Sequence, residues 1–220
     1  ERPAICSKFR EYKVCGMGPP SSGGLAVSQI LGIVDQFPVS SQYDAQSLRL
    51  LGGATRLAFA DRGRYVADGD FVSVPTEGLI STDYLAGRAS LLTGNVALDE
   101  VFPGNPKYLN ASLFMDDRSL EFPSTSHISI VDSYGNALSM TSTIENAFGS
   151  RLMTHGFLLN NELTDFSFKS HHDGVPIANR VEPGKRPRSS MAPTIVLKDD
   201  RPVLVIGSPG GSRIISDVVK

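Results

Sequence analysis

Two stretches decide the fold: Ser124-Thr125-Ser126-His127-Ile128-Ser129-Ile130-Val131-Asp132 and Gly207-Ser208-Pro209-Gly210-Gly211-Ser212-Arg213. In the first, a hydroxyl residue stands at the start of a short alternating strand. In the second, a glycine-rich turn follows another strand and can present backbone N–H groups. A nucleophilic hydroxyl and N–H groups that stabilise an oxyanion are the parts of an acyl-transfer site. Together the two stretches predict a site that processes amides.

Two hairpins surround these stretches. Ile128 and Ile130 alternate with polar residues, a turn follows at 132–136, and Leu138 and Met140 continue the alternation. This pattern is typical of a β-hairpin. A second hairpin is expected at 194–206, with its turn at 199–202, and Ser212 and Arg213 are expected to open a helix after it.

The first part of the chain favours helices. A short strand at 12–15 is followed by helical spacing from Val27 to Val34, and a second helix is expected over 44–62. Ser81 or Thr82 is expected to cap a third helix. Helices first and paired strands second predict an α+β layered fold. Residues 95–124 lack periodicity and are predicted to form a long loop or linker that could be cleaved.

Composition excludes several classes of protein. The chain has 220 residues, a formal net charge of -2 and 40% hydrophobic residues, which fits a globular protein with a sizeable core. That charge gives no argument for a nucleic-acid partner, and no apolar run is long enough for a membrane helix. Cys6 and Cys15 lack the spacing of a redox or zinc pair, which leaves the compartment open. Because the chain opens at Glu1-Arg2-Pro3 and stops within an expected helix, it is predicted to be a piece of a longer protein.

Thr125 is the residue in which nucleophilic chemistry is expected. A hydroxyl needs a neighbouring base, and an N-terminal threonine can use its own α-amine for that purpose. This requires cleavage of the bond between Ser124 and Thr125. Taken alone, a threonine before a strand is more often an ordinary β-forming residue or a loop cap.

The wider pattern resembles the γ-glutamyltranspeptidase family of N-terminal nucleophile hydrolases. The similar residues follow the family's order over nearly the whole chain. They are Thr125-Ser126-His127, Ser129, Val131-Asp132, Gly135-Asn136, Thr143, Phe148-Gly149, Leu158-Leu159-Asn160-Asn161, Asp165-Phe166-Ser167, Lys185-Arg186-Pro187-Arg188-Ser189-Ser190-Met191 and 207–213, with Pro19-Pro20-Ser21-Ser22-Gly23-Gly24 and Ala58-Phe59-Ala60-Asp61-Arg62 upstream.

The resemblance implies an αββα sandwich, truncated at both ends in this chain. Residues 1–124 would be the C-terminal part of the large subunit, mostly helical, with the linker at 95–124. Residues 125–220 would be the N-terminal part of the small subunit. The missing N-terminal half of the precursor would be a partner, and it would supply an arginine that grips the substrate. No arginine in residues 1–124 matches that motif.

The resemblance also implies a mechanism without a cofactor or a metal. The Thr125 hydroxyl would cut the chain at the Ser124 carbonyl and then attack a γ-glutamyl amide such as glutathione. Water, an amino acid or a peptide would accept the γ-glutamyl group. Thr143 would contact the nucleophile, and the N–H groups of Gly210 and Gly211 would hold the oxyanion.

Substrate contacts carry over in the same way. Glu162 and Asp165 are similar to positions that hold the substrate α-amine, and Ser189 and Ser190 to the pair that binds its α-carboxylate. Glu145 stands where many relatives carry asparagine; it could still bind the α-amine, with altered preference. Without the resemblance, Asp165 could cap a turn and the serines could belong to an ordinary loop.

Other interpretations stay open. The stretch between Asp165 and Lys185 looks shorter than the lid-bearing region of bacterial relatives, so a cephalosporin-type acylase acting on a glutaryl group is an alternative. A non-catalytic, unprocessed binding module is another. Relatives are commonly periplasmic or secreted, and a cytoplasmic location is left open.

Several charged residues are expected to have no catalytic role. His171-His172-Asp173 lacks a second cluster of metal ligands and is expected to be a solvated loop. His127 is expected to support the site structurally, because it and Asp132 face opposite sides of their strand. Lys185, Arg186 and Arg188 are expected to form a solvated basic turn, one residue of which could help to position the loop ahead of Ser189.

Overall fold

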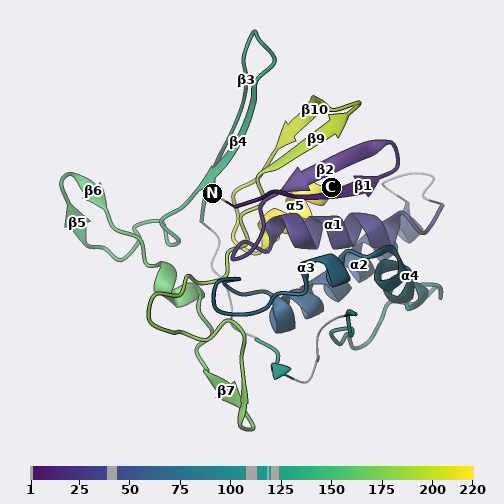
Figure 1. The fold of residues 1–220 in the computed structure, drawn as a ribbon, viewed down its shortest axis with the longest axis horizontal. Helices are drawn as coiled ribbons and strands as arrows, with labels where there is room; N and C mark the ends of the chain where they lie inside the picture. The colour runs from purple at the N-terminus through teal and green to yellow at the C-terminus, as the bar shows by residue number, and fades with distance from the viewer. Residues whose placement is uncertain (1, 39–43, 108–112, 118, 120–123) are drawn as a thin grey trace.

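Helices are the main regular elements in the first half of the chain (Figure 1). The computed structural model describes residues 2–38, 44–107, 113–117, 119 and 124–220. The α-helices are α1 (Gly23–Val34), α2 (Ala45–Tyr65), α3 (Thr76–Leu79), α4 (Thr82–Ser90) and α5 (Arg213–Val219). Helix α2 begins after Asp44, whose side chain accepts a hydrogen bond from the Ser47 backbone N–H at 2.7 Å. The predicted helices are confirmed, and α3 is an addition.

One four-stranded sheet brings the two ends of the chain together. It contains β1 (Ile5–Phe9), β2 (Tyr12–Gly16), β9 (Thr194–Lys198) and β10 (Arg201–Ile206), in the order β1-β2-β9-β10 with every pair antiparallel. Strand β1 was not predicted. In the tight turn of the predicted second hairpin, Asp199 and Asp200 both adopt positive φ angles, of 50° and 56°. Cys6 and Cys15 face each other across β1 and β2 and form a disulfide.

The helices cover one face of this sheet. Val14 of β2 is opposite Val196 of β9, and both pack against the main hydrophobic core. That core joins α1, α2, α4 and α5, with Ile30, Leu57 and Ile215 each at most 1% exposed. Removing such apolar side chains from water is the main force that stabilises the layer.

The first predicted hairpin lies beside the sheet rather than within it. Strands β3 (Ser126–Val131) and β4 (Ala137–Ser142) pair as predicted, with Ile128 opposite Met140 and Ile130 opposite Leu138. The hairpin is connected to the sheet by Ser139, whose hydroxyl donates to the Ile206 carbonyl at 3.0 Å and accepts from the Thr194 N–H at 3.0 Å. Figure 1 shows the hairpin next to β9 and β10, extending away from the helices.

Short elements complete the second half. They are the two-residue pairs β5 (Met153–Thr154) with β6 (Phe157–Leu158) and β7 (His171–His172) with β8 (Val175–Pro176), and the 3₁₀ helix η2 (Glu162–Asp165). None of the described helices is long and apolar enough to cross a membrane.

The described parts of the predicted linker have few regular elements but many contacts. Residues 95–107 contain neither helix nor strand. Gly104 donates its N–H to Asp61 at 2.8 Å, and its carbonyl accepts from the Tyr65 hydroxyl at 2.6 Å. Met115 forms a bridge with Ile177. The prediction for residues 108–112, 118 and 120–123 lies outside the described residues.

Candidate active site

The peptide bond before Thr125 lies against two threonine hydroxyls. The Thr125 hydroxyl donates to the carbonyl of Ser124, and the hydroxyl of Thr143, the residue after β4, donates to the same oxygen at 3.3 Å. The Glu145 N–H donates to the Thr143 oxygen at 2.9 Å, so the Thr143 proton is directed to the carbonyl. The structure therefore places the Thr143 hydroxyl next to the bond between Ser124 and Thr125, and the roles that the resemblance implies for these residues stay predictions.

Three carboxylates gather next to Thr143. Glu145 is buried with a φ of 69°, and its Oε2 accepts a hydrogen bond from the Asn161 side chain. Burial, and secondarily the charge of Glu145, raises the pKa of Glu162, while a hydrogen bond with Asp165 opposes the shift. Within the described residues, one buried oxygen of Glu145 and one of Glu162 have no hydrogen-bond partner. Buried acceptors of this kind suit a cationic ligand such as an ammonium group.

The glycine-rich turn lies between β10 and α5. Gly210 and Gly211 have φ angles of 133° and 59°, a region that L-residues with side chains rarely adopt. The turn is connected to β3 through His127, because a Cβ at Gly207 would lie 2.1 Å from the His127 Cε1. No hydrogen bond among the described residues joins Thr125 to either Gly210 or Gly211. The structure thus brings the two motifs together through His127 and Gly207.

His127 has the supporting role expected of it. Its ring nitrogens bond the hydroxyls of Thr141 at 2.9 Å and Ser129 at 3.0 Å. Partial burial lowers the pKa of the imidazole, which favours its neutral form.

The two serines lie on a segment that packs against the start of α1. The Ser189 N–H donates to the Pro20 carbonyl at 3.0 Å, and the Ser22 N–H donates to the Ser189 carbonyl at 2.8 Å. The Ser189 hydroxyl accepts from the Met191 N–H at 3.1 Å. The Ser190 hydroxyl accepts from the guanidinium of Arg62 at 2.6 Å. The Pro-Pro-Ser-Ser-Gly-Gly motif therefore supports the serine pair.

Asn179 connects the segment that carries Ser189 and Ser190 (the serine segment) with the carboxylate cluster next to Thr143. The sequence did not indicate this role. Its side-chain N–H donates to the Asp165 carbonyl at 2.8 Å and to Asp117 at 3.2 Å. Its side-chain oxygen accepts from the Arg188 N–H at 2.9 Å, directly before Ser189. Asn179 is fully buried, but a lone asparagine between Ala178 and Arg180 carries no sequence signal of this role.

The prediction that Lys185, Arg186 and Arg188 form a solvated turn is wrong for Lys185 and Arg188. Lys185 is buried and donates to the Ala178 carbonyl at 2.7 Å. Arg188 is buried and pairs with Asp117 at 3.1 Å. Only Arg186 is exposed, and it pairs with Asp68 and Asp70. The error arose because a charged residue can be buried when a partner compensates its charge, as Glu182 does for Lys185 and Asp117 does for Arg188.

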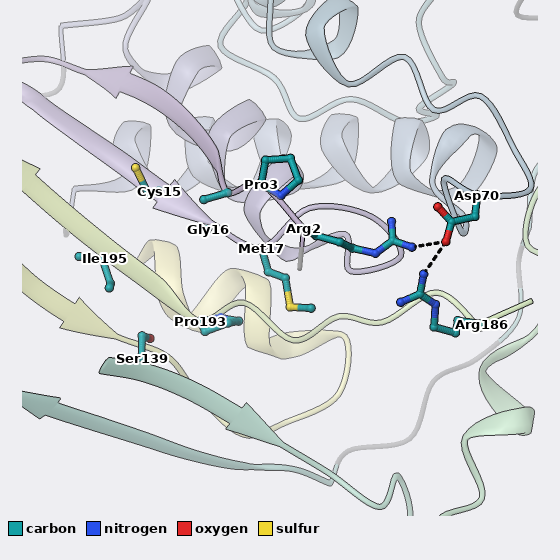
Figure 2. Close-up of a pocket in the computed structure, with 11 residues that line it drawn as sticks. Arg2, Pro3, Cys15, Gly16, Met17, Asp70, Ser139, Arg186, Pro193 and Ile195 are labelled. Carbon is teal, nitrogen blue, oxygen red and sulfur yellow. Dashed lines mark hydrogen bonds and ion pairs between the residues drawn. The ribbon is translucent and has the colours of Figure 1, made fainter. Parts of the chain in front are cut away.

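A cavity of about 870 Å³ is lined by Arg186 and Pro193, which precede and follow the two serines in sequence, but not by Ser189 or Ser190 (Figure 2). Cys15 and Ile195 line it from the outer face of the sheet, and Ser139 lines it from β4. At one end Arg2 and Arg186 both point to Asp70, at 2.6 and 2.9 Å. None of the described lining residues is a predicted site residue.

The structure offers no cluster of metal ligands in its described part. No group of three or more His, Cys, Asp or Glu side chains there is arranged to hold a metal ion. His171 and His172 are exposed on β7.

Comparison with known proteins decides the family. The family model for γ-glutamyltranspeptidase matches residues 1–220. The chain belongs to this family. It is 42% identical over 229 residues to the glutathione hydrolase proenzyme of Bacillus subtilis, covering 98% of this chain and 38% of that protein. For the glutathione hydrolase proenzyme of Escherichia coli K12 the identity is 39%, over 100% of this chain and 38% of that protein.

Acylases are more distant relatives of this γ-glutamyltranspeptidase-family chain. The acylase ACY 1 proenzyme of a Pseudomonas strain is 32% identical over 100% of this chain and 37% of its own length. The crystal structure of cephalosporin acylase from Bacillus halodurans matches with a TM-score of 0.81 at 25% identity, over 99% of this chain and 36% of that chain. The mixed α+β fold is thus shared with acylase structures. The chain spans about 38% of the length of the curated relatives named above.

Proposed function

We propose that the protein containing this chain is a γ-glutamyltranspeptidase that cuts itself between Ser124 and Thr125. The observation that carries the proposal is the convergence of the Thr125 and Thr143 hydroxyls on the Ser124 carbonyl. A nucleophile and a donor to the developing oxyanion are what such a cleavage needs.

Self-cleavage proceeds through an ester. The Thr125 hydroxyl oxygen attacks the Ser124 carbonyl carbon, and the Thr143 hydroxyl stabilises the negative charge on the carbonyl oxygen. The C–N bond breaks, the nitrogen takes up the proton that the hydroxyl lost, and Ser124 is left esterified to Thr125. Water hydrolyses the ester, which gives a new carboxylate at Ser124 and a free α-amine at Thr125.

The released threonine then turns over substrate. Its α-amine acts as the base for its own hydroxyl, which attacks the γ-amide carbonyl of glutathione or a related compound. The N–H groups of Gly210 and Gly211 hold the oxyanion, with the turn placed by the contact of Gly207 with His127. The amine leaves with a proton, and water, an amino acid or a peptide releases the γ-glutamyl group.

Two clusters recognise the amino-acid head of the substrate. The carboxylates of Glu145 and Glu162, each with one buried oxygen that has no hydrogen-bond partner among the described residues, bind its α-amine together with Asp165. The hydroxyls of Ser189 and Ser190 bind its α-carboxylate. Asn179 joins the two clusters and so fixes their separation.

The fold proposal follows from the same relatives. Helices cover one face of the sheet, and the β3–β4 hairpin lies next to β9 and β10, beyond a cavity on the other face. We assign these to the first helical layer and the two sheets of an αββα sandwich that the rest of the precursor completes. Residues 1–124 belong to the large subunit and residues 125–220 to the small subunit.

A cephalosporin-type acylase is the second candidate, supported by the match to an acylase structure. A glutaryl group has no α-amine, so the buried carboxylates beside Thr143 favour the γ-glutamyl substrate. The test compares γ-glutamyl and glutaryl p-nitroanilides on the protein that contains this chain. Preference for the γ-glutamyl anilide supports the proposal, preference for glutaryl supports the acylase, and refusal of both contradicts both.

A further inference from the structure

Arg62 is a buried cation directly behind the serine pair. It lies on α2 and is 5% exposed. Its Nε donates to the Ser22 hydroxyl at 2.7 Å, and a terminal nitrogen donates to the Ser190 hydroxyl at 2.6 Å. The guanidinium also lies over the Phe59 ring, at 5.5 Å from its centroid. One side chain thus joins α2, the start of α1 and the serine segment.

These contacts fix the direction in which the hydroxyls donate. A guanidinium has donors and no acceptor, so both serine oxygens must accept from Arg62. Ser22 passes its own proton to the Ser189 carbonyl at 2.7 Å. The Ser190 proton is directed to an acceptor other than Arg62. Ser189 is oriented similarly, because its oxygen accepts from the Met191 N–H.

The electrostatics favour an anion in front of Ser190. A hydroxyl that accepts from a cation is a stronger donor on its other side, because hydrogen bonds in a chain polarise one another.

We propose that Arg62 is a positioning residue for the α-carboxylate site. It orients Ser190 by donating to its hydroxyl oxygen, so that the Ser190 hydroxyl can donate to the carboxylate, and it does so without contacting the substrate. The inference rests on the function proposed above. Lysine is a poor substitute, because a single ammonium lacks the planar fork with which Arg62 reaches Ser22 and Ser190 together.

The test compares two substrates that differ only in the carboxylate. γ-Glutamyl p-nitroanilide carries it, and 4-aminobutanoyl p-nitroanilide has the same chain and amine with hydrogen in its place. Arg62→Gln in the self-cleaved protein should lower the ratio of their kcat/KM values about tenfold, mainly through KM for the γ-glutamyl substrate. The ratio for Arg62→Lys should lie between the ratio for Arg62→Gln and the ratio for the wild type.

Controls separate positioning from folding. Arg64→Gln changes the next arginine along α2, which pairs with Asp116 at a partly exposed site, and should leave the ratio unchanged. In a Ser190→Ala background, Arg62→Gln should change the ratio little further. If Arg62→Gln does not fold, Arg62→Lys decides by the same ratio. An equal loss on both substrates, or no loss, overturns the inference, whereas a wild-type protein inactive on both contradicts the proposed function instead.

Discussion

Two neighbouring aspartates before the proposed cleavage site form ion pairs of very different burial. Asp117 pairs with Arg188 at 3.1 Å, and their side chains are 0% and 2% exposed. Asp116 pairs with Arg64 at 2.7 Å, and their side chains are 26% and 23% exposed. The substitutions Asp117→Ala and Asp116→Ala therefore compare the same chemical change in a buried and a partly exposed pair.

The two substitutions are expected to lower the free energy of unfolding by amounts that differ by several kcal/mol. Asp117→Ala leaves the Arg188 charge buried without the carboxylate that faces it, which costs about 3–5 kcal/mol. It also removes the acceptor of the Ser119 and Asn179 N–H groups. Asp116→Ala should cost less than about 1 kcal/mol, because solvent screens a partly exposed pair.

Urea unfolding of the protein containing this chain measures both effects, in an uncleaved Thr125→Ala background. For a urea m-value of about 1–3 kcal/mol/M, Asp117→Ala should lower the midpoint of the transition by about 1 M or more. Because Asp117 anchors the chain shortly before Ser124, the same substitution in the wild-type background should also slow self-cleavage. Equal midpoints for the two variants would refute the reasoning.

The pH dependence of this pair has a definite sign. Burial by itself raises the pKa of Asp117, but Arg188 and hydrogen bonds from Ser119 and Asn179 outweigh it, and the pKa is lowered. A depressed folded-state pKa contributes stability above the unfolded value, near pH 4, and this stability is lost as the pH falls through the folded value. The difference in stability between wild type and Asp117→Asn should therefore shrink at low pH.

Two further predictions concern the site. Gly207→Ala puts a Cβ 2.1 Å from the His127 ring and should lower the free energy of unfolding, measured in urea, by about 1–3 kcal/mol. In a His127→Ala background, the same substitution should lose most of this effect. Gly52→Ala is the control that should have little effect, because no atom lies within 4 Å of its added Cβ. The pKa of Glu162 is higher in the folded protein than in the unfolded chain. The folded state therefore loses stability as the pH rises from the unfolded-state pKa through the folded-state pKa. Glu162→Gln should therefore stabilise the protein at pH 7 relative to wild type but not at pH 3.5, and a pH-independent difference would contradict this.

The local sequence pattern was sufficient to predict the longer strands and helices. Alternation in 128–140 and 194–206 predicted both hairpins, and the apolar spacing over 44–62 predicted α2. The short pairs β5–β6 and β7–β8 have only two residues a strand, which is too few for a period to be recognised.

Long-range pairing was not predictable in the same way. Arg188 is buried because Asp117 lies beside it, 71 residues away in sequence. Arg62 and Ser190 are separated by 128 residues, and nothing in the local sequence of either indicates the other. The resemblance to the γ-glutamyltranspeptidase family named the residues of the candidate site, but the contacts among them required the structure.

The central claim is that Thr125 releases itself from Ser124. Intact-mass spectra of the full-length protein and of its Thr125→Ala variant, taken after incubation, test it most directly. The account predicts two fragments divided between Ser124 and Thr125 in the wild type, and one uncut chain in the variant. A wild-type chain that stays whole, or a variant that is cut at the same bond, would contradict it.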